Sequence, residues 1–149
     1  MQLGAGMDFF DTVVRYETHL WNHLDDRLHD AGAVALPTLF ALRVVHRNAG
    51  HCRVQELRTE LGVTVGAASK LVDRFERDGL AERTPHPTDR RSSLISLTPA
   101  GEKALDAGVR VVEQALGEHL ADASDIERTT AVLDKLLADL GTTGTEMAR

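Results

Sequence analysis

The chain has 149 residues, of which 42% are hydrophobic and 27% are charged, so it is long enough to fold as one domain around a proper core. Its formal net charge is −6, and its single cysteine, Cys52, excludes an internal disulfide framework. The sequence shows neither a signal peptide nor an apolar run long enough to span a membrane, which predicts a cytoplasmic protein.

Two helices are predicted before Cys52. The first covers residues 9–30, because apolar residues recur there at intervals of three and four. The members of this stripe are Phe10, Val13, Val14, Leu20, Trp21, Leu24 and Leu28. The second helix has Pro37 in its first turn and ends near Asn48, and its almost entirely apolar stripe predicts a buried position.

Two shorter amphipathic helices follow, separated by a tight connection at Gly62. Val54, Leu57 and Leu61 share one face of the first of them. The second is predicted over residues 64–78, because Thr64 is a favourable N-cap and apolar residues again recur at helical spacing. The residues of that apolar face are Ala68, Leu71, Val72 and Phe75.

The opposite face of the helix over residues 64–78 suits contact with DNA. Small residues at its start let the backbone approach base edges in the major groove, and cations farther along can meet phosphates. The predicted contacts are Thr64, Val65, Gly66, Ala67, Lys70 and Arg74. The alternative is a surface helix whose cations are merely solvated.

A hairpin is predicted after this helix. Residues 80–83 and 94–97 are short strand-like segments, and the long loop between them is stiffened by Pro85 and Pro87. Near the tip of the loop lie Asp89, Arg90 and Arg91. Arginines at the end of a protruding hairpin suit the minor groove, where negative potential is focused.

The glycine turn, the helix ending in RFERDGL, the loop TDRR and the segment LISLTPAG together resemble the MarR (multiple antibiotic resistance regulator) family of bacterial transcription factors. By this resemblance, Asp89 orients Arg91, which enters the minor groove, and Arg90 meets phosphate or its own domain. The resemblance also implies a homodimer that binds palindromic double-stranded DNA, usually as a repressor released by a small molecule.

The remaining sequence completes a mainly α fold class. Thr98 and Pro99 mark the start of a long helix, and Ser124 caps a last one. We therefore expect a winged helix-turn-helix domain with a small antiparallel β-wing over residues 34–101. A linking helix over residues 98–121 leads to dimerisation helices formed by residues 1–33 and 121–149.

The charge distribution agrees with this division. Residues 53–91 hold 8 Lys+Arg against 7 Asp+Glu, whereas residues 1–52 hold 4 against 6 and residues 92–149 hold 5 against 10. The predicted DNA-binding segment is therefore the one segment that is not acidic. We expect a modest number of phosphate contacts and binding that weakens with salt.

The first helix carries candidates for an effector site. Residues four apart on a helix share a face, and an arginine can hold a carboxylate through two hydrogen bonds. Because the family often responds to phenols or aromatic acids, we expect such an effector, with Arg15 as its anchor. The predicted effector-binding residues are Arg15, His19, Trp21 and His23. The alternative is that Arg15 is solvated or forms an interface ion pair, and that the histidines bind nothing.

Zinc sensing and redox sensing are the alternatives to an aromatic effector. His19 and His23 have the spacing of a zinc-chelating pair, and His46, His51, Cys52 and His119 are further potential ligands, but no compact cluster exists. No resident metal or cofactor is therefore expected. Redox sensing would require a lowered pKa of the Cys52 thiol, and flanking by a histidine and an arginine is weak support, so an inert thiol is expected.

Catalysis has little support in the sequence. A Gly-rich phosphate loop, a nucleophile elbow and the H-E-x-x-H motif are all absent, and the acidic residues are scattered along helix surfaces. The chain is therefore not expected to be an enzyme. The alternative from another class is a winged-helix module that binds protein rather than DNA.

Overall fold

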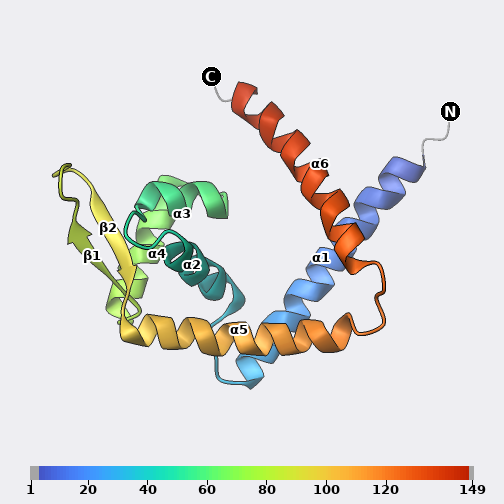
Figure 1. The fold of residues 1–149 in the computed structure, drawn as a ribbon, viewed down its shortest axis with the longest axis horizontal. Helices are drawn as coiled ribbons and strands as arrows, with labels where there is room; N and C mark the ends of the chain where they lie inside the picture. The colour runs from blue at the N-terminus through green and yellow to red at the C-terminus, as the bar shows by residue number, and fades with distance from the viewer. Residues whose placement is uncertain (1–3, 148–149) are drawn as a thin grey trace. The chain divides into compact units, whose positions relative to one another are not determined.

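The structure is a computed structural model of the chain, and it describes the backbone of residues 4–147 and the side chains of residues 4–141. Within the described residues the chain forms six helices and a two-stranded antiparallel sheet, which confirms the predicted fold class (Figure 1). One compact unit ends at Glu113, and the second begins at Gln114, inside a continuous helix.

The elements follow the predicted order. They are α1 (Ala5–Asp30), α2 (Leu36–Arg47), α3 (Val54–Leu61), α4 (Val65–Arg77), β1 (Ala81–Pro85), β2 (Ser93–Leu97), α5 (Pro99–His119) and α6 (Ile126–Met147). Helix α1 begins one turn earlier than predicted, because the N–H of Asp8 already donates to the carbonyl of Gly4 at 2.8 Å. None of the described helices combines the length and hydrophobicity that a membrane span requires.

The core of the first unit is built by the predicted apolar stripes. Phe75 and Val72 of α4 and Leu57 of α3 are fully buried, and α2 contributes Leu42 and Val45. Helix α3 packs against both α2 and α4, β2 lies against α2, and β1 lies against α4 (Figure 1). The buried position predicted for α2 is confirmed, and α4 is held with its opposite face exposed.

The connection between α3 and α4 is a glycine turn. Gly62 has a φ of 66°, the left-handed conformation that a side chain disfavours, and it ends α3. The N–H of Val63 then donates to the carbonyl of Arg58 at 3.1 Å. Helix α4 begins two residues later, so the angle between the two helices is set by this single turn.

Strands β1 and β2 form the predicted hairpin. They pair in antiparallel register from Ala81 opposite Leu97 to Pro85 opposite Ser93. A third backbone segment joins them, because the N–H of Ile95 donates to the carbonyl of Cys52 at 2.8 Å. The hairpin is thereby attached to the chain that precedes α3.

The start of α5 is tied to the end of α4. The Thr98 hydroxyl donates to the Gly79 carbonyl at 2.5 Å and accepts from the N–H of Gly101 at 3.1 Å, which makes Thr98 the predicted N-cap. Gly101 is needed here, since a Cβ on it would lie 1.9 Å from the carbonyl oxygen of Leu80. The turn that follows α4, at Gly79 and Leu80, is therefore in direct contact with the start of α5.

Apolar side chains remain exposed on α1 and on α6. On the first half of α1 these are Phe9, Phe10, Val13 and Val14. On α6, within the second unit, they are Val132, Leu133, Leu136, Leu137 and Leu140. Burial of apolar surface is the main favourable contribution to folding and association, so these faces are poorly satisfied in a single copy of the chain.

Candidate functional site

The start of α4 is open to solvent. The Thr64 side chain caps the helix by accepting from the N–H of Ala67 at 3.1 Å, as predicted. Val65, Gly66 and Ala67 are exposed, and no atom lies within 4 Å of the place where a Cβ on Gly66 would stand. A large flat ligand such as a duplex can therefore approach the backbone of this first turn.

The cations predicted on α4 lie on its exposed side. Lys70 and Arg74 are both exposed. The same helix also carries Asp73 and Glu76, which would repel phosphates if they were left alone. Arg83 of β1 prevents this, because its guanidinium donates to Asp73 at 2.8 Å and also contacts Glu76.

The contacts with Asp73 and Glu76 favour the charged form of Arg83. Burial works against its charged form, but the hydrogen bonds that the guanidinium donates to Asp73 and to Glu76 outweigh it and raise the pKa of Arg83 above its usual value. The two acids are thus compensated, and the exposed face of α4 keeps a positive balance. This arrangement was not predicted from the sequence, because Arg83 reaches α4 from the next element.

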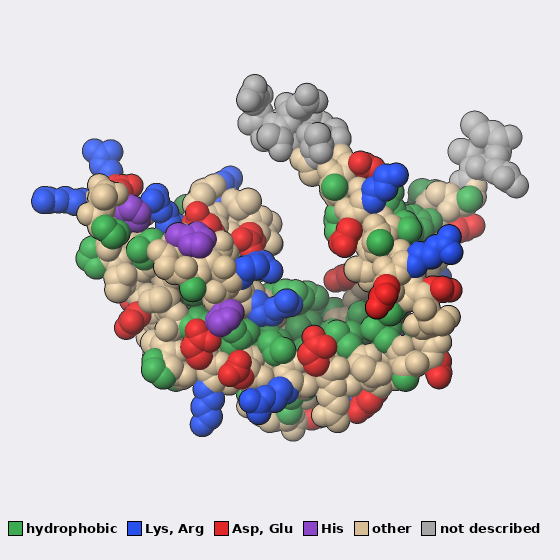
Figure 2. Space-filling model, in the orientation of Figure 1, with side chains coloured by type: hydrophobic (Ala, Val, Ile, Leu, Met, Phe, Trp, Pro, Cys, Tyr) green, Lys and Arg blue, Asp and Glu red, His purple; other side chains and the backbone are tan. Residues whose placement is uncertain are grey.

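The loop between β1 and β2 presents two arginines. Arg90 and Arg91 are exposed, and Figure 2 shows Lys and Arg side chains projecting from the tip of the hairpin. Asp89 is half-buried, and its Oδ1 accepts from the main-chain N–H of Arg91 at 3.0 Å. Asp89 therefore shapes the backbone that carries Arg91; that it also orients the side chain of Arg91 stays a prediction.

His86 supports this loop from inside. Its Nδ1 accepts from the main-chain N–H groups of Thr88 and Asp89 at 3.2 and 3.1 Å. Its Nε2 lies 2.7 Å from the guanidinium of Arg53, the N-cap residue of α3. The loop is thus joined to the helix-turn-helix by a side-chain contact that the sequence pattern did not indicate.

The four predicted effector residues do not share one pocket. Arg15 lines a surface hollow of about 610 Å³ formed by α1 alone, together with Asp8 and Asp11. His19 and His23 are exposed on α1. Trp21 instead stacks on Phe40 of α2, with ring centroids 5.6 Å apart.

Trp21 belongs to a mostly apolar pocket of about 420 Å³. Helices α1, α2, α3 and α4 all contribute to it, through Trp21, Pro37, Phe40, Glu60, Leu61, Val63 and Leu71. Leu71 is half-buried here, whereas the sequence pattern placed it with the fully buried residues of α4. An aromatic ring would find suitable contacts in this pocket.

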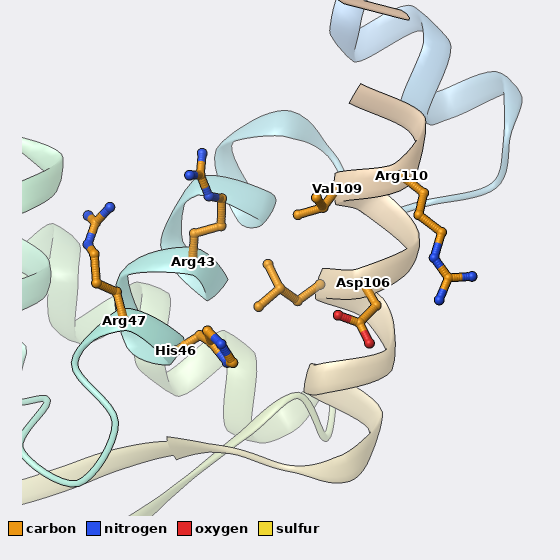
Figure 3. A pocket seen from close by; sticks show the side chains of 7 residues that line it. Arg43, His46, Arg47, Asp106, Val109 and Arg110 are labelled. Atoms are coloured by element: carbon orange, nitrogen blue, oxygen red, sulfur yellow. The ribbon is translucent and has the colours of Figure 1, made fainter. Parts of the chain in front are cut away.

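A basic pocket of about 480 Å³ lies between α2 and the first half of α5 (Figure 3). Its lining residues are Arg43, His46, Arg47, Leu105, Asp106, Val109 and Arg110. Two of these basic side chains are engaged, since His46 lies 3.1 Å from Glu102 and Arg47 pairs with Glu60. Within the described residues, Arg43 has no acidic partner, and it projects from α2 in the same direction as Arg47.

The sequence analysis missed this pocket. Its signal was present in the spacing of Arg43, His46 and Arg47, which places three basic groups on neighbouring positions of one helix. The spacing alone does not reveal that α5 passes beside them. An arginine at the edge of a pocket with apolar walls can hold the carboxylate of a small organic acid.

Neither metal binding nor thiol chemistry is favoured by the geometry. Among the described residues, no three His, Cys, Asp or Glu side chains converge on a point that could hold a metal ion. Cys52 is buried, and desolvation by burial, with smaller contributions from Glu56 and Glu60, raises its pKa to about 11. An inaccessible, protonated thiol is a poor nucleophile.

The chain matches known proteins over its winged helix-turn-helix segment. A family model described as the MarR family matches residues 27–92. The multiple antibiotic resistance protein MarR of Escherichia coli (strain K12) is 32% identical over 85 residues, which cover 55% of this chain and 59% of that protein. The chain thus aligns with little more than half the length of this relative.

Solved structures extend the likeness of fold to nearly the whole chain. A mutant MarR from E. coli complexed with operator DNA has a TM-score of 0.76 and 23% identity, and the match covers 92% of this chain and 99% of that one. CouR from Rhodococcus jostii RHA1, bound to p-coumaroyl-CoA, has a TM-score of 0.74 and 21% identity, with 95% of each chain covered.

The sequence match includes the glycine turn, α4 and the whole loop that carries Arg90 and Arg91. The structural matches include the winged helix together with the flanking helices. Over residues 27–92 the chain is therefore similar to the MarR family of winged helix-turn-helix proteins, and it shares the fold of the solved structures.

Proposed function

We propose that the chain is a cytoplasmic transcriptional regulator that binds palindromic double-stranded DNA as a homodimer. It acts as a repressor and is released by a small aromatic acid or phenol. The observation that carries the proposal is the open first turn of α4 beside a hairpin with two exposed arginines. These are the two elements by which a winged helix engages the major and the minor groove.

The contacts follow from the exposure of each residue. Thr64, Val65, Gly66, Ala67 and Lys70 face the major groove, and Arg74 meets a phosphate. At the hairpin, Arg91 enters the minor groove, while Asp89 fixes its backbone and Arg90 meets the sugar-phosphate chain. The E. coli relative of the same fold was solved with operator DNA, which supports the assignment of this surface.

The homodimer is proposed from the apolar side chains left exposed on α1 and α6. A second copy of the chain would cover these faces, since a two-fold axis makes the same surface meet itself. Two copies of α4 would then lie on one side of a duplex. Such an arrangement requires a palindromic site with half-sites about one helical turn apart.

The effector is proposed to bind through its carboxylate. CouR, a protein of the same fold, was solved with p-coumaroyl-CoA, which carries an aromatic group. In this chain the anchor is either Arg15 on α1, on the helix that also carries His19, Trp21 and His23, or Arg43 in the pocket between α2 and α5. Arg43 is favoured by geometry, because its pocket has walls from two helices. Binding would favour a spacing of the two α4 helices that no longer fits successive major grooves.

The proposal is tested by fluorescence anisotropy with the full chain and a library of palindromic duplexes at two salt concentrations. Tight, sequence-selective and salt-dependent binding is expected, and an aromatic acid such as p-coumarate should relieve it. The titration is repeated with zinc, which should have no effect. Absence of salt-dependent binding to any duplex would replace this proposal with a winged-helix module that binds protein.

A further inference from the structure

The first turn of α4 presents methyl groups rather than hydrogen-bonding groups. Val65 is 54% exposed although it is a large apolar residue, and Ala67 is exposed beside it. Gly66 between them adds no side chain and has open space above it. The part of the helix that is placed to enter a groove is therefore apolar.

The polar side chains near this turn either form hydrogen bonds within the helix cap or lie away from the exposed surface of the turn. The Thr64 hydroxyl oxygen accepts from the N–H of Ala67 and holds the helix cap. Ser69 is half-buried, so the first exposed polar side chain inside α4 is that of Lys70, more than one turn farther along. Between Val63 and Ser69 the sequence has no Arg, Asn, Gln, Asp or Glu.

The absence of these side chains limits how the first turn of α4 can recognise a base pair. Guanine is read by the fork of an arginine or by a lysine, adenine by the amide of Asn or Gln, and cytosine by a carboxylate. The major groove offers one apolar group, the 5-methyl group of thymine. A valine side chain with half of its surface exposed is complementary to that methyl group and to no other base edge.

We propose that Val65, with Ala67 beside it, makes the operator half-site specific for thymine by packing against the thymine 5-methyl group. This inference rests on the proposed function, and it adds the chemical feature of DNA that the reading helix selects. Arg74 contributes affinity through a phosphate, which carries no sequence information. Lys70 faces the major groove more than one turn beyond Val65. Discrimination at the start of α4 then comes from apolar contact.

The test uses the full chain and its operator, obtained by selection from a random duplex library. Each thymine in the half-site is replaced in turn by deoxyuridine, which removes the methyl group and keeps the base pairing. At the positions that Val65 reads, the Kd should rise roughly fourfold for each buried methyl group lost. Replacement of thymines outside the half-sites serves as the matched control and should leave the Kd unchanged.

The variant Val65→Ala completes a thermodynamic cycle. Val65 is the first residue of α4 and is exposed, so the shorter side chain should not disturb the fold, and circular dichroism checks this. The variant should bind the thymine operator several-fold more weakly than the parent. Its Kd should no longer respond to deoxyuridine at the positions that Val65 reads.

The possible outcomes distinguish a failure of the Val65 inference from a failure of the proposed DNA-binding function. Selected half-sites that carry thymine opposite α4, with a deoxyuridine effect that Val65→Ala abolishes, support it. Selective binding that ignores deoxyuridine, or half-sites with invariant G·C pairs opposite α4, overturns the role of Val65 and leaves the regulator intact. Absence of selective binding to any duplex removes the proposed function and this inference together.

Discussion

Arg83 Nη1 donates to Asp73 Oδ1 at 2.8 Å, and this bond joins β1 to α4. The same guanidinium contacts Glu76 one turn farther along the helix. One cation therefore compensates two acids on the helix that is proposed to approach DNA. The clamp has a structural role, since it fixes the hairpin to α4, and an electrostatic one, since it limits repulsion of phosphates.

Arg83→Gln should separate these two roles. The free energy of unfolding is expected to fall by about 1 kcal/mol at low salt, because two partly exposed ion pairs are lost. Urea titrations at low and high salt measure this loss, which should shrink as salt screens the pairs. DNA affinity should fall as well, because Asp73 and Glu76 become uncompensated.

Arg77→Gln is the matched control for Arg83. Arg77 lies on α4, the helix that carries Asp73 and Glu76. Its side chain is 72% exposed, and its contact with Asp78 is 3.9 Å long. Its loss should leave the unfolding free energy almost unchanged. Equal destabilisation by the two substitutions would contradict the clamp.

Arg91→Ala should weaken operator binding by about 1–3 kcal/mol, which is the cost of losing one good groove contact. The fold should remain intact, because the Arg91 side chain is exposed and its structural contact is through the main-chain N–H. Anisotropy titrations measure the affinity, with Arg128→Ala on α6 as an exposed arginine far along the chain from the hairpin. Unchanged affinity in a folded Arg91→Ala protein removes the hairpin from the DNA interface.

Two glycine substitutions should have opposite effects on stability. A Cβ at Gly66 meets nothing within 4 Å, so Gly66→Ala should stabilise α4 by about 0.5–1 kcal/mol. Gly101→Ala should destabilise the chain by about 1–3 kcal/mol, since its Cβ would meet the backbone of Leu80. Thermal unfolding measures both. Gly66→Ala should nevertheless weaken DNA binding, and a variant that is more stable and binds equally well would argue against close approach at this turn.

The anchor of the effector can be identified with two substitutions. Arg43→Ala should leave DNA affinity within about twofold, because Arg43 lies on α2 and not on the proposed DNA surface, but it should weaken the response to an aromatic carboxylate by about tenfold. Arg15→Ala is the parallel variant. A lost response in Arg15→Ala alone would return the effector to α1, and a normal response in both would place it elsewhere.

Cys52 should make stability depend on pH in the alkaline range. Burial raises its pKa from 9.0 to about 11, so the folded chain keeps a proton that the unfolded chain releases first. The resulting stabilisation is complete below about pH 9 and is lost as pH rises toward 11, by roughly 2–3 kcal/mol in total. Urea titrations across this range, compared with Cys52→Ala, isolate the effect, because the variant lacks the thiol. A slope shared by both proteins would assign the pH dependence to other groups.

Local signals made most of the fold predictable. Gly62 and Thr64 fix the helix-turn-helix through their own backbone and side chain, and Thr98 does the same for α5. The functional pockets depend on contacts between distant segments, and they were harder to predict. Arg15 and Trp21 lie on one helix, yet Trp21 turns toward Phe40 on α2, so the predicted effector residues are divided between hollows. Arg43 lines a pocket only because α5 passes beside α2, and Arg83 compensates acids only because β1 lies beside α4.

The Thr98 side chain has a mechanical consequence. Its hydroxyl bonds both to the carbonyl of Gly79 and to the N–H of Gly101, and its own N–H donates to the Leu80 carbonyl at 3.0 Å. The turn that follows α4, at Gly79 and Leu80, is therefore hydrogen-bonded directly to the residue that caps α5. A ligand that tilts the first turns of α5 would therefore act directly on the turn at Gly79 and Leu80, three residues or fewer from the end of the helix proposed to face DNA.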